Sequence, residues 1–231
     1  MKKPDERLGA AAELVRQGAV FADIGTDHAL LPIFLCREGR VRHAYAADIN
    51  EGPLASARAA VSAAGLSDKI TPVLTDGLQG LSDRGLTDIA ICGMGGELIV
   101  SILSAAPFVK NPDIRLILQP MSRPEDLRYY LADEGFEIIE ERAVFAAGRC
   151  YFCLAVHYTG VPYSISRIEA ALGRLSGSPD SDAFLALLEK HYRSQQRKCE
   201  GLRRGGTPDS EEEAYLWELC ALLKEKKHDR P

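Results

Sequence analysis

Residues 20–28 read VFADIGTDH, and this stretch decides the fold. The run 20–24 is apolar apart from Asp23, as expected of a buried strand, and Gly25 begins a polar loop directly after it. In open parallel sheets covered by helices, ligands bind at the carboxyl ends of the strands. We therefore expect Asp23 and the loop after it to lie at a ligand site.

Short apolar runs alternate with helical stretches from this strand to about Tyr158. The pattern predicts strands at 20–24, 43–48, 70–74, 89–92 and 116–119, with helices at 29–38, 52–64 and 124–134. Residues 137–145 and 151–158, joined by 146–149, are predicted to form an antiparallel pair at the end of the sheet. The expected fold class is α/β, a Rossmann-like sheet with helices on both faces.

The composition changes near Gly160, where we place a domain boundary between 1–160 and 161–231. Apolar residues then recur at helical spacing over 184–202 and 215–223, separated by the GGTPD stretch at 205–209. Ser210 and Glu213 form a candidate capping box for the second helix. The pattern predicts an antiparallel pair of helices.

Charge is unevenly distributed along the chain. A net charge of -5 over 231 residues argues weakly against a nucleic-acid partner. Residues 190–231, however, hold 10 Lys+Arg against 8 Asp+Glu, whereas residues 1–189 hold 18 against 25. Such a basic segment is either a solvated helix face or a surface that binds phosphates. Its first part contains six basic residues, which are Lys190, Arg193, Arg197, Lys198, Arg203 and Arg204.

Several classes of protein are disfavoured. The six cysteines are scattered through predicted core segments, which is typical of reduced thiols. Cys150 and Cys153 are three apart in a predicted strand and point to opposite faces, so we predict no metal or redox pair there. The opening residues 1–6 contain no apolar segment, and no stretch approaches the roughly 20 apolar residues that span a bilayer. We expect a cytoplasmic protein without a membrane segment or a metal.

Acidic residues and glycines follow successive predicted strands. Asp23 can hold its loop by hydrogen bonds or pair with a ligand's ammonium group, and Asp48 can bind a ribose or cap the next helix. Asp76, before Gly77, can accept from an adenine amine or form an ordinary turn. The GMGG run at 93–96 permits either close ligand approach or tight packing, and it begins a helix. A dinucleotide site is disfavoured because Asp27 and His28 stand where a pyrophosphate loop needs glycines.

Four motifs occur together in this chain: ADIGTDHALLP at 22–32, DG at 76–77, ICGMGGELI at 91–99 and LILQPM at 116–121. With them the chain resembles, over essentially its whole length, the bacterial tRNA (adenine-N1)-methyltransferases of the TrmK type, which modify adenine 22 in the D-loop region. The resemblance implies a class I methyltransferase fold followed by a coiled-coil-like helical domain. It also implies S-adenosylmethionine as the cofactor and tRNA as the substrate.

The resemblance assigns site residues as well. The implied cofactor site comprises Asp23, Gly25, Asp27, His28, Asp48, Ile49, Asp76, Gly77, Gly93, Met94 and Gly95. Gly96 borders the target base, and Gln119 with Pro120 either offers an amide to the base edge or forms a structural turn. Predicted phosphate contacts are Lys190, Arg193, Arg197 and Lys198, assisted by Arg123 and Arg128.

The chemistry implied by the resemblance needs positioning more than a base. N1 of neutral adenine already carries a lone pair, and it lies on the Watson–Crick edge, so the target base must be unpaired or flipped. Asp27 and His28 are the catalytic candidates, although both can merely shape the loop. The alternatives are a methyltransferase for another RNA or a small molecule, and a non-catalytic RNA-binding module.

Overall fold

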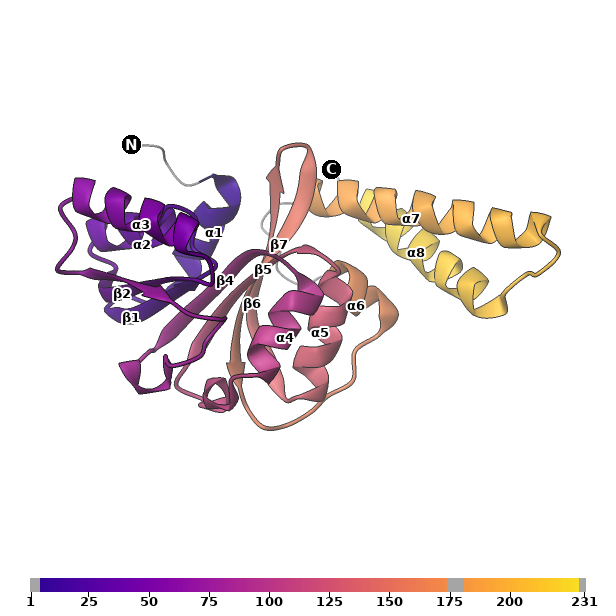
Figure 1. Cartoon of the computed structure of the whole chain (residues 1–231). Coiled ribbons are helices and arrows are strands. Elements are labelled where there is room, and N and C mark those ends of the chain that lie inside the picture. Colours follow the sequence, from indigo (N-terminus) through magenta and orange to yellow (C-terminus); the bar gives the residue numbers. More distant parts are fainter. Residues whose placement is uncertain (1–4, 174–180, 229–231) are drawn as a thin grey trace.

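A computed structural model describes residues 5–173 and 181–228 (Figure 1). In this part of the chain a seven-stranded sheet has the order β3-β2-β1-β4-β5-β7-β6. The first five of these strands are parallel, whereas β7 pairs antiparallel with both β5 and β6. The strands are β1 (Ala19–Ile24), β2 (Val41–Asp48), β3 (Ile70–Leu74), β4 (Asp88–Gly95), β5 (Arg115–Ser122), β6 (Phe136–Ala146) and β7 (Arg149–Tyr158).

Helices cover both faces of the sheet and continue beyond it. One core cluster joins α1, α2 and α3 to one face, and a second joins α4 and α5 to the other. Figure 1 shows the two layers on either side of the strands. The helices are α1 (Glu6–Leu14), α2 (Leu30–Arg37), α3 (Glu51–Ala63), α4 (Gly96–Ser104), α5 (Pro124–Asp133), α6 (Arg167–Leu172), α7 (Ser181–Arg204) and α8 (Ser210–His228), with short 3-10 turns η1 (Ser82–Arg84) and η2 (Pro107–Lys110).

The predicted α/β fold class is confirmed, and the differences lie mainly at element ends. The fourth strand continues to Gly95, so three residues of the glycine run belong to β4 and only Gly96 begins α4. Helix α1 was not predicted. The carboxylate of Asp5 caps it by accepting from the backbone N–H groups of Arg7 and Leu8.

The predicted antiparallel pair forms a long hairpin. Its turn consists of Ala147 and Gly148, both with positive φ (49° and 73°), the geometry that matches the twist of two antiparallel strands. The hairpin stands between α1 and the start of α7 (Figure 1). Its two strands are therefore the part of the sheet that contacts α7.

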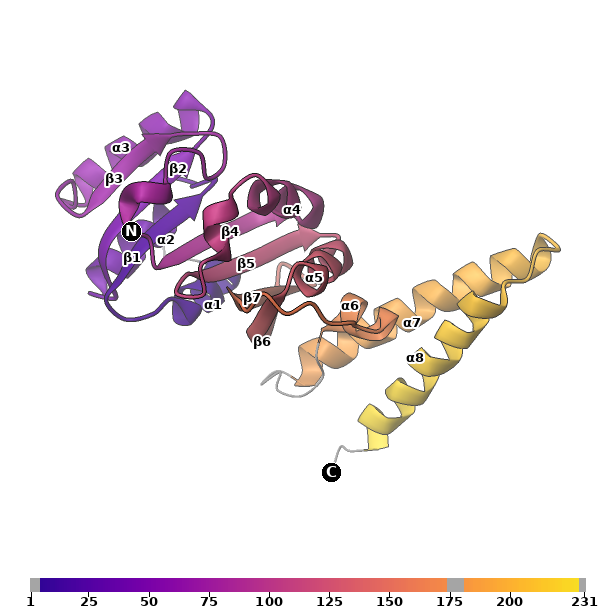
Figure 2. The ribbon, with the colours of Figure 1, turned by 90° about the horizontal axis from the view of Figure 1, so that it is seen from below.

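The two predicted C-terminal helices are confirmed as α7 and α8. Phe184 and Leu188 of α7 pack against Tyr215 and Leu219 of α8, and Figure 2 shows the pair projecting away from the sheet. The predicted capping box is wrong, because Asp209 occupies the capping position. Its carboxylate accepts from the backbone N–H groups of residues 211 (2.9 Å) and 212 (3.2 Å).

Helix α6 joins the two parts of the chain. It follows the predicted boundary near Gly160, yet it packs against α5 of the sheet domain and also contacts α7. The boundary itself stays a prediction. The cysteines in the structure are all free thiols. Within the described residues we find no group of His, Cys, Asp and Glu able to hold a metal ion, and no helix there has the length and apolar character to cross a membrane. Residues 1–4, on which the prediction from the opening segment depends, lie outside the described chain.

Candidate active site

A cavity of about 270 Å³ opens at the carboxyl ends of β1 and β4. These strands are paired neighbours, so the loops that follow them meet at one edge of the sheet. Five predicted site residues come together there, together with five others that the sequence analysis had not assigned to the site. The lining consists of Arg7, Leu8, Asp23, Gly25, Asp27, Leu30, Leu31, Cys92, Gly93 and Gln119.

Asp23 is the buried acid of this cavity. Its exposed fraction is 6%, and the described residues give it no ion pair. The pKa of Asp23 is raised to about 6, chiefly by burial. The hydroxyl of Thr26, which donates to the carboxylate at 2.6 Å, opposes the shift, and the nearby carboxylates of Asp27 and Asp48 add to it. A cation bound beside Asp23 would relieve this cost of burial.

The loop after β1 holds backbone strain. Gly25 has φ +72°, and His28 and Ala29 follow with φ near +50°, a region that costs non-glycine residues energy. A Cβ on Gly25 would lie 2.1 Å from the terminal methyl of Met94. The surrounding packing, and not the conformational preference of the residues themselves, therefore holds the loop in this conformation.

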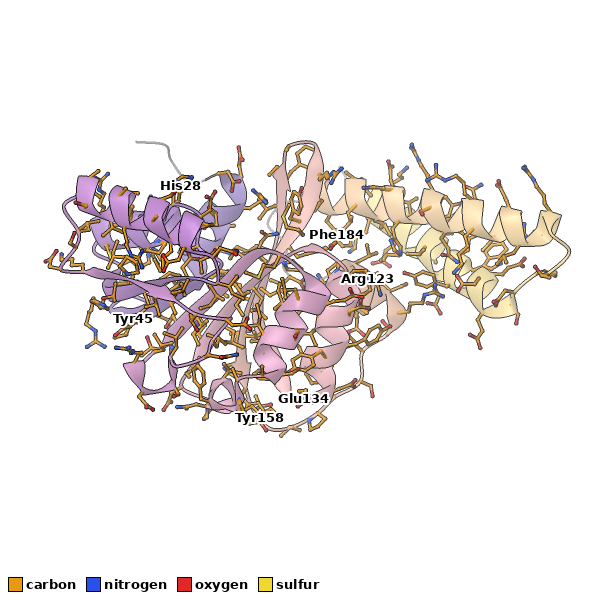
Figure 3. The ribbon with its side chains drawn as sticks, in the orientation of Figure 1. His28, Tyr45, Arg123, Glu134, Tyr158 and Phe184 are labelled. Atoms are coloured by element: carbon orange, nitrogen blue, oxygen red, sulfur yellow. The ribbon has the colours of Figure 1, made fainter. Side chains whose placement is uncertain are left out.

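The two candidate catalytic side chains of this loop, Asp27 and His28, line different hollows. Asp27 lines the cavity, whereas His28 lines a separate apolar hollow beside Phe34 and Ala60, between α2 and α3. Both side chains are exposed, and Nε2 of His28 lies 3.5 Å from a carboxylate oxygen of Asp27. Figure 3 shows His28 among the helices of that side of the molecule. Only Asp27 is placed to meet a molecule in the cavity.

Gln119 holds the glycine end of β4. Its amide oxygen accepts from the backbone N–H of Gly93 at 3.1 Å, and its amide nitrogen donates to the carbonyl of Pro120 at 3.1 Å. Gly93 itself has φ +79° with open space where a Cβ would stand. The amide of Gln119 therefore maintains the shape of the cavity, while Pro120 is buried outside it.

Four predicted cofactor residues lie further along the same edge, beyond the cavity. Asp48 accepts from the backbone N–H of Asn50 at 2.7 Å; Asn50, not Asp48, occupies the N-cap position of α3, so the capping alternative is wrong. Ile49 is a large apolar residue with an exposed fraction of 58%. Asp76, just before Gly77, is exposed in a turn closed by its own carbonyl. The half-buried carboxylate of Asp48, the exposed carboxylate of Asp76 and the exposed Ile49 together suit a ligand with hydroxyls and a flat apolar face.

Arg7 is the most informative of the lining residues that the sequence analysis did not assign. Arg7 and its neighbour Leu8 come from α1, whereas the other lining residues lie in β1, β4 and β5 or in the segment after β1, and the guanidinium of Arg7 pairs with Asp5 at 2.5 Å. It also lies 2.8 Å from the sulfur of Met121 and 5.4 Å above the ring of Tyr151. The only signal in the sequence was the pair Arg7-Leu8 ahead of an Ala-rich stretch.

Comparison with known proteins identifies this arrangement. A family model described as a methyltransferase domain matches residues 5–154. The tRNA (adenine(22)-N(1))-methyltransferase of Bacillus subtilis (strain 168) is 35% identical over 175 residues, which are 76% of this chain and 74% of that protein. The chain belongs to this methyltransferase family. The resemblance inferred from the four motifs is thereby confirmed.

Solved structures of the family agree in fold over nearly the whole chain. A Streptococcus pneumoniae protein assigned as a tRNA (m1A22) methyltransferase, in complex with S-adenosyl-L-methionine, has a TM-score of 0.80 at 32% identity, covering 96% of this chain and 98% of its own. The Bacillus subtilis m1A22 tRNA methyltransferase TrmK has a TM-score of 0.75 at 28% identity, covering 98% of both chains. The family fold thus includes the C-terminal helices.

The four basic residues of α7 that were predicted to bind phosphate differ in whether they already have an acidic partner. Lys198 pairs with Glu212 at 3.0 Å and Arg193 approaches Glu189 at 3.7 Å. Hydrogen bonds from Arg167, Gln195 and Lys198 hold the pKa of Glu212 at about 2, so its carboxylate stays ionised. The described residues give neither Lys190 nor Arg197 an ion pair. These two cations are the ones available to another molecule without breaking an existing pair.

Two further cations near the sheet were predicted to assist them, and one prediction is wrong. Arg128 has an exposed fraction of 1%, so it cannot reach a phosphate; it is an internal residue of α5 bound to Glu141 of β6. Arg123 is exposed at the start of α5 (Figure 3) but pairs with Asp126 at 2.8 Å and faces Glu97 at 3.4 Å. Neither is a free phosphate ligand.

Gly96 allows two loops of the family site to touch. A Cβ at this position would stand 2.1 Å from the carbonyl oxygen of Arg123. Gly96→Ala is therefore expected to lower the free energy of unfolding by about 1–3 kcal/mol, because backbone must move to admit the methyl group. Gly9→Ala in α1 is the control: nothing lies within 4 Å of its Cβ, so a gain of about 0.5–1 kcal/mol is expected. Urea denaturation of both variants measures the difference; equal effects would refute the close-contact argument.

Proposed function

We propose that this protein transfers the methyl group of S-adenosylmethionine to N1 of adenine 22 in tRNA. The observation that carries the proposal is the buried carboxyl of Asp23 in a cavity at the ends of β1 and β4, within a chain that belongs to the tRNA (adenine(22)-N(1))-methyltransferase family. The proposed substrate is a cytoplasmic RNA, so the proposal also places the protein in the cytoplasm.

The residues along the sheet edge fit this cofactor. When bound, S-adenosylmethionine supplies a methyl group activated by a sulfonium ion. In the proposal, ionised Asp23 pairs with the ammonium group of its methionine part, which offsets the cost of burying the carboxylate. Asp48 binds the ribose hydroxyls, and Ile49 covers the adenine with its exposed apolar side chain. The further proposed cofactor contacts come from Gly25, Asp27, His28, Asp76, Gly77, Gly93, Met94 and Gly95.

The chain's contribution to the chemistry is positioning, shielding and charge. Adenine N1 needs no base to remove a proton, so the cavity walls act by excluding water and fixing the direction of attack. Gln119 keeps the backbone of Gly93 in place through its 3.1 Å hydrogen bond. Methylation leaves a positive charge on the base, and we assign Asp27 to stabilise that charge from the cavity rim as an acceptor for the base's exocyclic amine.

The RNA contacts follow from the charges on α7. Lys190 and Arg197 offer unpaired cations to phosphates, whereas Arg193 and Lys198 must exchange an acidic partner for a phosphate. Gly96 and Pro120 are proposed to border the target base through backbone atoms, because neither presents a polar side chain.

Transfer of a labelled methyl group tests the proposal directly. Purified protein is incubated with labelled S-adenosylmethionine and an unmodified tRNA transcript, and the methylated nucleoside is mapped by digestion and mass spectrometry. We expect N1-methyladenosine at position 22 and none in a transcript that carries guanine there. Asp27→Asn should lower kcat by about 10- to 100-fold with little change in KM, because it removes the charge and keeps the shape. Cofactor binding without transfer to any tRNA would refute the substrate and leave another RNA or a small molecule as the acceptor.

A further inference from the structure

A second hollow of about 320 Å³ lies between the sheet domain and α7. One side is formed by the end of β5, the start of α5 and the strand β7, and the other side by the first half of α7. We call it the interdomain groove. Its lining consists of Pro120, Met121, Pro124, Glu125, Cys150, Tyr151, Phe152, Ala171, Leu187, Lys190, His191 and Ser194.

The groove and the cavity share one wall. Arg7 lines the cavity, while Met121 and Tyr151 line the groove. The guanidinium of Arg7 lies 2.8 Å from the sulfur of Met121 and 5.4 Å from the centre of the Tyr151 ring. The two hollows are therefore separated by little more than the thickness of one side chain.

One lining residue of the groove, Phe152, is held in place by a buried ion pair on its other side. Phe152 lies under the guanidinium of Arg128 at 4.3 Å, and Arg128 is fixed by Glu141 and by a 2.6 Å hydrogen bond to the carbonyl of Ala170. Ala171, the next residue, also lines the groove. Buried ionic contacts thus preform the hollow before anything enters it.

The lining combines apolar walls with polar side chains, which are Glu125 at the start of α5 and Lys190, His191 and Ser194 on α7. Met121, Tyr151 and Leu187 present apolar surface, and Met121 is partly exposed. Lys190 is exposed on the α7 side, and the described residues give it no ion pair. A slot with apolar or aromatic walls and a cation beside it is the arrangement that takes an unstacked nucleic-acid base and its phosphate.

We propose that the interdomain groove binds the base of the nucleotide adjacent to the target adenine in the same RNA strand, with Lys190 on the phosphate that joins them. The inference rests on the proposed function. The target adenine must be unpaired or flipped to present N1 in the cavity, and the nucleotide next to it is then one backbone step away. Because the groove lies directly beyond Arg7, a neighbour one backbone step from the cavity reaches it.

Abasic transcripts test the proposal. The base immediately 5′ or 3′ of the target adenine is removed, one at a time, and kcat/KM is measured. We expect the wild-type protein to lose about 10-fold for one of the two positions, the usual effect of a lost stacking contact. Ser194→Trp fills the groove, so it should lose a similar factor on the intact transcript and nothing further on the abasic one. Ala221→Trp, an exposed alanine of α8 outside the groove lining, should keep the wild-type response.

A milder variant provides an independent measurement. Lys190→Gln should lower kcat/KM on the intact transcript and remove the response to a neutral methylphosphonate placed at the joining phosphate. Calorimetry with S-adenosylmethionine should give wild-type affinity for both variants, which a general loss of structure would not. Two outcomes would overturn the groove assignment. In the first, the wild-type protein is insensitive to removal of either neighbouring base; in the second, the Ser194→Trp variant still loses the full factor on the abasic transcript. Failure of the wild-type protein to methylate any transcript would instead refute the proposed function.

Discussion

Replacing Arg128 by methionine is expected to lower the free energy of unfolding by about 3–5 kcal/mol, because it removes one charge of a buried ion pair and leaves the other charge buried. The guanidinium contacts Glu141, the carbonyl of Ala170 and the ring of Phe152, with side-chain exposures of 2% for Arg128 and 9% for Glu141. Four elements, α5, β6, β7 and α6, meet at this one side chain. Equilibrium unfolding in urea measures the change.

The double variant Arg128→Met/Glu141→Leu separates charge burial from packing. Removing both charges should recover much of the loss, since apolar residues of similar volume often replace a buried ion pair at little cost. The surface pair of Lys110 and Glu134, at 2.7 Å and about 40% exposed, is the matched control. Lys110→Met should leave the free energy of unfolding almost unchanged, because solvent screens an exposed ion pair. A loss of less than 1 kcal/mol for Arg128→Met would contradict the internal role assigned to this residue.

Asp23→Asn is expected to weaken S-adenosylmethionine binding by about 100-fold, the effect of removing a charge-assisted pair. The substitution keeps the shape of the side chain and an acceptor for the Thr26 hydroxyl. It also removes a carboxylate that is buried at a cost, so the protein without cofactor should be at least as stable at pH 7 as the wild type. Calorimetric titration and urea denaturation measure the two effects.

The pH dependence of Asp23 has a definite sign. Its pKa of about 6 in the folded protein lies above the ordinary value of 3.8, so the folded state holds the proton more tightly than the unfolded state. Its contribution to stability is therefore greatest below about pH 4 and is lost as the pH rises through 6. Cofactor binding has the opposite dependence, because the ammonium group pairs with the ionised carboxylate, and affinity should fall below pH 6.

Asp23→Asn should abolish the contribution of this residue to the pH dependence of stability and of cofactor affinity, since the amide does not titrate. Thr26→Val is the companion variant: it removes the 2.6 Å hydrogen bond that favours the ionised form, so the pH at which affinity falls should move upward. Wild-type affinity that stays constant between pH 5 and 7 would contradict the pairing of Asp23 with the cofactor.

The order of strands and the placement of acidic residues at their ends could be read from the sequence. The predicted strand at 70–74 is β3 without change. The helix predicted at 52–64 differs from α3 by one residue at each end, and the helix predicted at 124–134 differs from α5 by one residue at its C-terminus. Such elements arise from local periodicity and from glycines that end helices, such as Gly65 and Gly135 with φ near +70° or above. Asp23, Gly25, Asp27 and Gly93 meet because parallel strands align their carboxyl ends.

What the sequence determined by itself was therefore the sheet, the edge at which the site lies and the helical pair that follows. Tertiary structure alone decided which side chains face the site. Arg128, which the sequence predicted on the surface, is buried because Glu141 and Ala170 lie beside it only in the folded chain. Arg7 lines the cavity because α1 packs across the sheet. Asp27 and His28, which are neighbours in sequence, line different hollows because the strained loop between β1 and α2 takes positive φ at His28 and Ala29. Local patterns fix a residue's element and face, whereas partners far apart in sequence fix what its side chain touches.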